Sequence, residues 1–455
     1  MSTLLGVADC DGVAAWHGDA FLACHSPESR LPIGVRGTPP VPNMMSAYVL
    51  RLNLKTGKLV YATRIGGADF TAAFRVKVDA QGFAYATGLT RARDFPSTPD
   101  ALQPRFAGGD SDAFLVKLTP AGDIAYATLL GGSAADQGNG LELDGTGGVY
   151  IGGTTWSYDF PGQRISGPAG AGDVFVCYLR PGDRSAARAV VFGGSQEEKL
   201  TGLAADGKDG LFAVGYTKSR DFPALSPVQE DLRGTSDLFL TRLRIPDLAL
   251  TFSTFLGGTG DDSGWGVAAD RMGNPVVAGI TNSTDLPAAR KAFQRSAQGG
   301  LDAFVAKLEG PGYQSVSLTY FGGTKDDSSG YDGDDIKVDP AGNVWLVGLT
   351  SSRDLPLRDP MQPAYGGGDA DGFLAVFPPG LTDLCYATYR GGSDRDLLEG
   401  IDLAPDGAVV ATGLTFSKDL PMPAHAAQRT LSMVTVAGRV VNAAVLALQA
   451  PRGCR

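Results

Sequence analysis

Short apolar runs, separated by turns rich in glycine, aspartate and proline, follow one another along the whole chain. Residues 112–161 show the pattern once. Four runs stand there in order, which we call a, b, c and d: "AFLVKL" (113–118), "IAYATLL" (124–130), "NGLELD" (139–144) and "VYIGGTT" (149–155). Short runs rich in β-branched and aromatic residues, bounded by turn residues, predict β-strands.

The pattern recurs, and each copy closes on an Asp-Phe-Pro or Asp-Leu-Pro triplet. We call the segment that contains this triplet, from the end of strand d to the next strand a, the DFP connector. Successive triplets lie 62 to 69 residues apart. A further copy stands at 18–32, where Arg30 replaces the aspartate. Seven copies of four short strands predict an all-β fold, a seven-bladed β-propeller with four-stranded antiparallel blades. Strand a is expected to be the innermost strand of each blade.

The two ends of the chain suggest one shared blade. The chain begins just before a strand c, and "VVNAAVLAL" (440–448) matches strand a. An extra apolar piece, "SMVTV" (432–436), precedes it. We therefore expect N-terminal strands within 1–26 and C-terminal strands within 432–449 to close one blade, which makes 1–455 a single domain.

The repeat "GG[ST]xxD…VDxxGNxxxxGxTxSxDFP" resembles the bacterial SBBP family of β-propeller repeats. The copy "DPAGNVWLVGLTSSRDLP" (339–356) is the clearest. The resemblance implies the propeller fold and a secreted or cell-surface location. It implies no single catalytic activity.

The aspartate of the DFP connector is a structural residue in this interpretation. A catalytic carboxylate is needed once, whereas this one recurs in almost every copy. We expect it to accept backbone hydrogen bonds where the chain passes from strand d to strand a of the next blade. The residues are Asp94, Asp159, Asp221, Asp285, Asp354 and Asp419.

Strand direction places all long loops on one face, which we call the loop-rich face, and this face is acidic. One acid begins strand a and is expected to line the channel mouth: Asp112, Asp173, Asp237, Asp302 and Asp371. A second acid follows each Gly-Gly pair: Asp136, Glu198, Asp262, Asp327 and Asp396. Local hydrogen bonds to backbone, Ser or Thr groups, or a cation at the channel mouth, would each relieve their repulsion.

One copy carries an acidic insertion, "KDDSSGYDGDD" (325–335), assigned from sequence to its Gly-Gly loop. Oxygen-rich loops bent by glycine suit Ca²⁺, and Mg²⁺ or Mn²⁺ are weaker alternatives. A solvated acidic loop is the simpler reading. The candidate metal ligands are Asp326, Asp327, Asp332, Asp334 and Asp335.

Ligand-binding candidates are the aromatic and histidine residues near the loops. Aromatic faces stack on sugars, although packing between blades explains such residues equally well. The two histidines suggest a metal or an acid–base pair. The residues chosen are Trp156, Tyr331, Tyr365, His25 and His425, with Tyr158 among the other aromatic residues nearby.

Composition narrows the partners and the compartment. The net charge is −10 with no basic run, which argues against nucleic acid, and no stretch is long enough to span a membrane. Neither a charged start nor a long apolar run marks a signal peptide in "MSTLLGVADC". Cys10 and Cys24 lie on strands of one expected hairpin and can pair, while Cys177 and Cys385 are expected to be buried thiols.

These observations favour an extracytoplasmic or cell-surface module, either binding or structural. It would present an acidic loop face, with Ca²⁺ as a candidate ion, to a glycan or protein partner. The alternative is a polysaccharide lyase or hydrolase with its site at the channel mouth.

Overall fold

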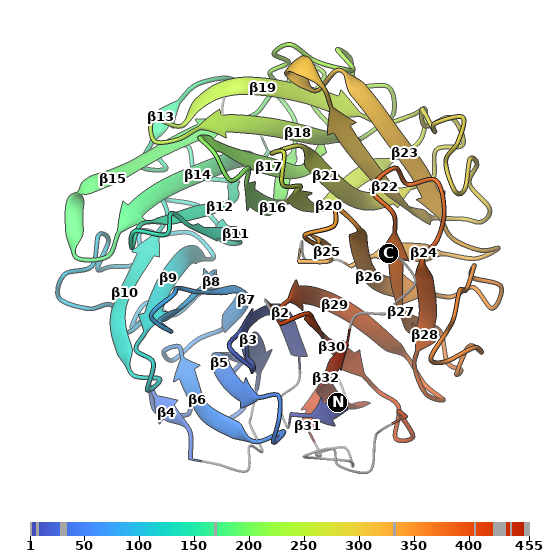
Figure 1. The fold of residues 1–455 in the computed structure, drawn as a ribbon. Helices are drawn as coiled ribbons and strands as arrows, with labels where there is room; N and C mark the ends of the chain where they lie inside the picture. Colours follow the sequence, from blue (N-terminus) through green and yellow to red (C-terminus); the bar gives the residue numbers. More distant parts are fainter. Residues whose placement is uncertain are drawn as a thin grey trace. The chain divides into compact units, whose positions relative to one another are not determined.

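The computed structural model describes residues 2–5, 9–27, 34–167, 171–330, 334–404, 406–421, 434–436 and 439–449. Within these ranges the chain is all-β, with one short 3₁₀ turn at Pro311–Tyr313. The strands form seven sheets, which are the blades of a seven-bladed β-propeller fold (Figure 1). The predicted fold class is therefore confirmed, although the blades contain extra short strands.

The first three sheets come from the N-terminal part of the chain. Their strands, each in spatial order, are β2 (Asp9–Trp16), β3 (Asp19–Ser26), β5 (Ser46–Asn53), β6 (Leu59–Ile65) and β4 (Arg36–Gly37); β7 (Thr71–Val78), β8 (Ala84–Thr90), β9 (Asp112–Leu118) and β10 (Ile124–Leu130); and β11 (Asp136–Leu143), β12 (Val149–Thr155), β14 (Asp173–Arg180), β15 (Asp183–Phe192) and β13 (Gln163–Arg164).

The next three sheets follow the same plan. Their strands are β16 (Glu198–Ala205), β17 (Gly210–Thr217), β18 (Asp237–Arg244) and β19 (Ala249–Leu256); β20 (Asp262–Ala269), β21 (Pro275–Thr281), β22 (Asp302–Glu309) and β23 (Ser315–Phe321); and β24 (Asp327–Ser329) with β25 (Ile336–Val338), β26 (Val344–Thr350), β27 (Asp371–Phe377) and β28 (Tyr386–Arg390).

The last sheet combines both ends of the chain. Its order is β29 (Asp396–Leu403), β30 (Ala408–Thr415), β32 (Arg439–Gln449) and β1 (Ser2–Leu4), and β31 (Val434–Val436) also pairs with β32.

The strand order within a sheet is c–d–a–b, and this corrects two expectations. Strand d pairs with strand a, as where Thr90 of β8 lies opposite Asp112 of β9. The DFP connector therefore joins neighbouring strands of one sheet, and the Gly-Gly loop carries the chain to the next. Strand a lies between d and b, so the expectation that it is innermost is wrong. A periodic sequence does not mark which strand begins a sheet.

The expected shared blade is also wrong in its details. β2 and β3 pair with β5 in a sheet of their own, rather than with the C-terminal strand a. The short β1 pairs with β32 instead, with Thr3 opposite Val445. The N-terminal residues before β2 resemble no copy of the repeat, so the pattern gave no signal for this strand.

The acidic insertion falls inside strand c rather than in the Gly-Gly loop. Asp327 opens β24 opposite Thr350, as Asp136 opens β11 opposite Thr155. The extra residues come after Ser329, and the strand resumes as β25, which pairs with the same β26. Equivalent strands carry a one-residue bulge at this point, and a bulge tolerates added residues better than a regular ladder does.

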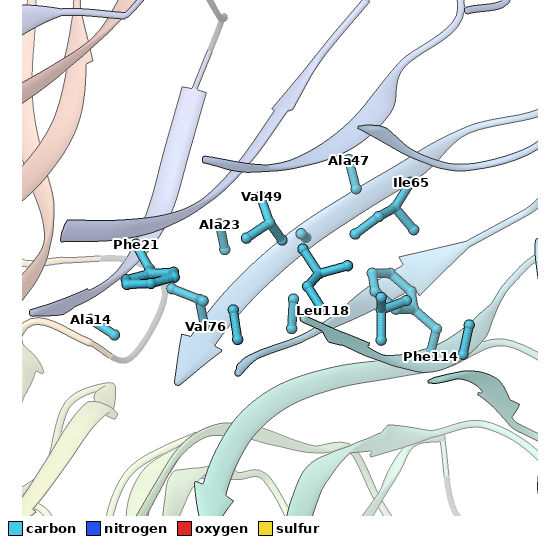
Figure 2. Packing of buried hydrophobic residues seen from close by; sticks show 14 of the residues in the cluster. Ala14, Phe21, Ala23, Ala47, Val49, Ile65, Val76, Phe114 and Leu118 are labelled. Atoms are coloured by element: carbon cyan, nitrogen blue, oxygen red, sulfur yellow. The ribbon is translucent and has the colours of Figure 1, made fainter. Parts of the chain in front are cut away.

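The chain divides into two compact units. One holds 1–165, 172–192 and 402–449, and the other holds 166–171, 193–401 and 450–455. Within the first unit, neighbouring sheets pack through small and aromatic side chains from their facing strands, as Figure 2 shows for Phe21, Val49, Val76 and Phe114. Burial of such alternating apolar positions stabilises each sheet.

Four cysteines have defined states. Cys10 and Cys24 form a disulfide between β2 and β3, a bridge that the sequence left open. Cys177 is a buried free thiol, as predicted. Cys385 is disulfide-bonded, so its prediction as a thiol is wrong.

Candidate functional site

The DFP aspartates fasten two loops together. Asp221 Oδ1 accepts hydrogen bonds from the backbone N–H and the hydroxyl of Ser195, both at 2.9 Å. The backbone bond is the larger cause of the lowered pKa of Asp221. The same pair of bonds joins Asp159 to Ser133, Asp285 to Thr259, and Asp354 to Thr324. The structural role is confirmed, but the bonded amide lies in the Gly-Gly loop some 26 residues earlier rather than in the connector itself.

The connector also packs its aromatic residue onto strand a. Phe160 stacks on Phe175 with centroids 4.4 Å apart. Phe222 lies 4.9 Å from Phe239 in the equivalent place. These contacts explain why an apolar residue follows the aspartate in the triplet.

The two series of acids meet in pairs at the Gly-Gly loops. A Cβ built on Gly131 would lie 2.6 Å from Asp112 Oδ1 and 2.8 Å from Asp136 Oδ2. Only glycine leaves room for both carboxyl groups. Equivalent pairs are Asp237 with Asp262 around Gly257, and Asp302 with Asp327 around Gly322.

Each pair is buried and held by local hydrogen bonds. Asp136 accepts from the Gly132 N–H at 2.8 Å and from Ser157 Oγ at 2.9 Å. Asp112 accepts from Gln103 Nε2 and from the Ala107 N–H, both at 2.9 Å. Burial is the main cause that raises the pKa of Asp112 to about 7 and that of Asp136 to about 6.

The other members of the first acid series have comparable surroundings. Burial raises the pKa of Asp371 to about 7, and Gly366 donates its N–H to this residue. Burial also raises the pKa values of Asp237 and Asp302. Asp173 instead forms an ion pair with Arg164 at 2.9 Å. All five side chains are almost fully buried, so none of them is exposed at the surface of the described structure.

The described part of the acidic insertion has several partners within the protein. Asp326 Oδ1 accepts from the Leu301 N–H at 3.0 Å, and buried Asp327 accepts from Thr350 and Ser352. Asp334 lies 3.5 Å from Lys337 Nζ. Asp335 is buried, and Asp332 lies outside the described residues. A Ca²⁺ site here stays a prediction.

One group among the described residues brings three potential metal ligands together: Asp9, Asp11 and His25, whose ligand atoms all lie within 4.8 Å of one another. His25 Nδ1 is 3.4 Å from Asp11 Oδ2. The sequence pattern predicts His25 as a candidate ligand, but not the two aspartates. Their spacing of two along strand c was the available signal. His425 lies outside the described residues.

Two aromatic residues of one DFP connector are exposed. Tyr158 is 83% exposed and Trp156 is 36% exposed. Tyr365 is partly buried; its ring meets Tyr389 edge-on and its hydroxyl donates to Gly368 O at 3.2 Å. Tyr331 lies outside the described residues. Tyr158, which the sequence placed only among nearby aromatic residues, is thus the most accessible of these rings.

A small cavity of about 260 Å³ lies in the second unit, beside the connector that enters β22. Gln294, Gln298, Thr324 and Asp354 are among its polar lining residues. Gln294 Oε1 and Asp354 Oδ1 already accept bonds from the Gly-Gly loop. The cavity is therefore part of the same loop-fastening arrangement.

Among the described residues, no helix has the length and apolar character needed to cross a membrane.

Comparison with known proteins identifies the family of the repeat but shows no specific function. Residues 125–161 match the family described as "Beta-propeller repeat", SBBP. Regulatory protein FlaEY of Caulobacter vibrioides is 23% identical over 353 residues, which cover 74% of this chain and 35% of that protein. The chain thus spans about a third of the length of this curated relative.

Two solved structures are similar at low sequence identity. A protein of unknown function from Dyadobacter fermentans is 11% identical, with a TM-score of 0.40 over 98% of this chain and 97% of that one. A puromycin-hydrolysing peptidase of Mycobacterium tuberculosis is 13% identical, with a TM-score of 0.43 over 90% of this chain and 50% of that one. No function is carried over from either. Residues 125–161 thus carry the β-propeller repeat of the SBBP family, within a seven-bladed β-propeller fold.

Proposed function

We propose that the chain is a bacterial binding module, located outside the cytoplasm or at the cell surface, that contacts a glycan through Trp156 and Tyr158. The observation that carries the proposal is the exposure of these two side chains on a connector that hydrogen bonds hold in place. Aromatic side chains give large contact areas at low entropic cost, which suits a recognition surface.

The connector is anchored at every residue around the two rings. Ser157, only 2% exposed, donates to Asp136 and accepts from the Ala134 N–H. Asp159 is bonded to Ser133, and Phe160 is buried against Phe175. Because the anchors fix the backbone of the connector, little backbone freedom is left to lose on binding.

The aromatic pair is specific to one copy of the repeat. Three positions separate the recurring Thr and Asp of the connector, and in other copies the first and third of them hold different residues: Arg91 and Arg93, Lys218 and Arg220, Asn282 and Thr284, Ser351 and Arg353, and Phe416 and Lys418. The blade itself therefore does not require Trp or Tyr here, which points to recognition rather than folding.

A glycan fits this surface better than a protein does. The sequence neighbours of the two rings, Thr155, Ser157 and Asp159, are polar, and the other large exposed apolar side chains among the described residues come from other segments: Val35, Val60, Leu225, Met272 and Met361. A sugar offers an apolar face to a ring and hydroxyl groups to its polar neighbours. A protein interface would need a broader apolar core.

The disulfide bonds support the proposed location outside the cytoplasm. Cys10 and Cys24 are joined, and Cys385 is disulfide-bonded. Disulfides persist in oxidising compartments and are rare in the reducing cytosol.

The polysaccharide-active enzyme remains the alternative function, and the structure offers it less support. A glycoside hydrolase needs two carboxyl groups that reach one bond of the substrate. The paired acids, such as Asp112 and Asp136, are fully buried and bonded to the loops. They would have to be uncovered before a sugar could reach them.

The test is retention of the protein on a panel of neutral and acidic polysaccharides, with reducing ends measured in the same samples. We expect retention without new reducing ends. Trp156→Ala and Tyr158→Ala should each weaken it by at least about tenfold, as for aromatic hot spots. Thr284→Ala, at the position equivalent to Tyr158, is the matched control and should bind normally.

New reducing ends would make the protein an enzyme. Retention that both aromatic substitutions leave unchanged, or binding to no glycan of the panel, would overturn the proposed surface.

A further inference from the structure

We propose that Asp9, Asp11 and His25 form a binding site for a divalent transition metal ion such as Zn²⁺. The proposal is independent of the glycan surface. It rests on the geometry of the β2–β3 hairpin and on a comparison with the equivalent hairpins of the same chain.

The backbone register brings the three side chains to one side of the hairpin. Asp9 lies directly opposite His25 in the antiparallel ladder. The register shifts between Cys10 and Gly12, so Asp11 is the extra residue of a β-bulge. Side chains of directly opposed residues approach closely, and a bulge turns its extra side chain toward a new direction. The three ligand atoms meet within 4.8 Å.

The separations suit a shared ion. Zn²⁺ lies about 2.0–2.2 Å from nitrogen and oxygen ligands, which places neighbouring ligands about 3–3.6 Å apart. Asp11 Oδ2 and His25 Nδ1 are already 3.4 Å apart. Asp9 Oδ1 accepts from the Cys10 N–H at 2.8 Å, which orients this carboxylate. Small side-chain rotations would close the remaining distance.

The surroundings favour a cation. Asp11 is only 2% exposed, and its neighbours in the strands, Cys10, Val13 and Cys24, belong to an apolar cluster. A buried carboxylate needs compensation for lost hydration, and a bound dication with an imidazole provides it. The Cys10–Cys24 disulfide joins the residue pair next to Asp9 and His25 in the ladder and helps to hold the ligands in register.

Other hairpins of the chain lack this set at the same register positions. The positions of Asp9, Asp11 and His25 correspond to Ala72, Phe74 and Leu89; Gln137, Asn139 and Thr154; Lys199, Thr201 and Tyr216; and Ser263, Trp265 and Ile280. The blade therefore folds without these ligands. The presence of two acids and a histidine at these three positions of one hairpin therefore indicates a role other than folding.

The donor set selects the class of metal. An imidazole nitrogen suits Zn²⁺ and similar ions, whereas Ca²⁺ prefers an all-oxygen set. Three protein ligands leave room for water or for a donor of a partner.

The test is titration of the chelator-treated, oxidised full chain with ZnCl₂ by calorimetry, with CaCl₂ as a parallel sample. We expect about one equivalent of Zn²⁺ and much weaker Ca²⁺ binding. Asp11→Asn and His25→Gln should each weaken Zn²⁺ binding by at least about tenfold, since even second-shell changes cost this much. His17→Asn, at the opposite end of the hairpin, is the matched control and should bind normally.

Two further measurements distinguish loss of the metal site from loss of the fold and identify the type of ligand. Circular dichroism of each variant shows whether it still folds. Co²⁺ bound at the site should give visible d–d bands without a thiolate charge-transfer band, because Cys10 and Cys24 are oxidised. Absence of stoichiometric Zn²⁺ binding, or binding that folded Asp11→Asn and His25→Gln retain in full, would overturn the proposal.

Discussion

Asp159 Oδ1 accepts hydrogen bonds from both the backbone N–H and the hydroxyl of Ser133, each at 2.8 Å. The two residues are 26 positions apart, one in a DFP connector and the other in the preceding Gly-Gly loop. The contact ties the segment between strands b and c to the segment between strands d and a. Its recurrence in other copies shows why this aspartate repeats along the chain.

Removing that carboxylate should loosen the Gly-Gly loop. We expect Asp159→Asn to speed amide hydrogen exchange at Ser133 and to lower the thermal midpoint modestly, because Asn keeps one acceptor but loses the charge. The measurement is hydrogen exchange followed by mass spectrometry. Asp231→Asn, an exposed residue, is the control. Unchanged exchange at 131–135 would show that the contact does not hold the loop.

Filling the space between a carboxyl pair should destabilise the protein. A Cβ at Gly131 would approach Asp112 Oδ1 to 2.6 Å, so Gly131→Ala must displace a bonded, buried side chain. We expect a loss of about 1–3 kcal/mol in the free energy of unfolding, as for overpacked cores. At Gly380, the nearest atom would be 3.6 Å from the new Cβ, so Gly380→Ala should cost little. Denaturant unfolding of both variants measures the difference, and equal effects would contradict the crowded pair.

The buried pairs should make the fold more stable in mild acid than in mild base. The pKa of Asp112 is raised by burial from 3.8 to about 7, so the folded state binds its proton more tightly than the unfolded state does. Its contribution is complete below about pH 4 and is lost as the pH rises toward 7. Asp371, raised to about 7, and Asp136 and Asp327, raised to about 6, act in the same direction.

We therefore expect a larger free energy of unfolding at pH 5 than at pH 8, measured by denaturant titration. Asp112→Asn should reduce the slope over this window by up to about 1.4 kcal/mol per pH unit, the value for one proton. Below about pH 4 the DFP aspartates act oppositely, because the lowered pKa values of Asp221 and Asp354 mean that protonation costs stability there. A slope that Asp112→Asn leaves unaltered would show that this residue does not take up the proton.

Breaking the hairpin disulfide should cost stability through the unfolded state. Cys10 and Cys24 are 14 positions apart, and closing a loop of this size is worth about 3 kcal/mol in the chain-entropy model. We expect the double variant Cys10→Ala and Cys24→Ala to lose an amount of this order in unfolding experiments without reductant. Comparison with a Cys177→Ala variant separates the effect from the loss of a buried thiol. A double variant as stable as the parent would rule out the entropic contribution.

Most of the fold could be predicted from the repeat, because each copy contains both the apolar runs and the turns. The hairpins, the loops that meet on one side and the structural role of the DFP aspartate all follow from such local signals. The strand order c–d–a–b within a sheet could not be predicted from these signals. The repeat looks the same in sequence whichever of its four strands begins a sheet. Trp156 and His25 could be chosen from the sequence as departures from the repeat. Asp9 and Asp11 required the register and the bulge, which depend on hydrogen bonding between strands.

The order c–d–a–b also determines what a cut in the chain would do. Strands d and a are joined by the connector but are also held by backbone pairing, for example over seven residue pairs from Val149 with Leu179 to Thr155 with Asp173. A single proteolytic nick in that connector would thus leave both fragments bound within one sheet. We therefore expect that the chain can be split at these connectors for fragment complementation, because backbone pairing within the sheet holds the two fragments together. For the same reason, the connectors are the expected positions for inserting another domain.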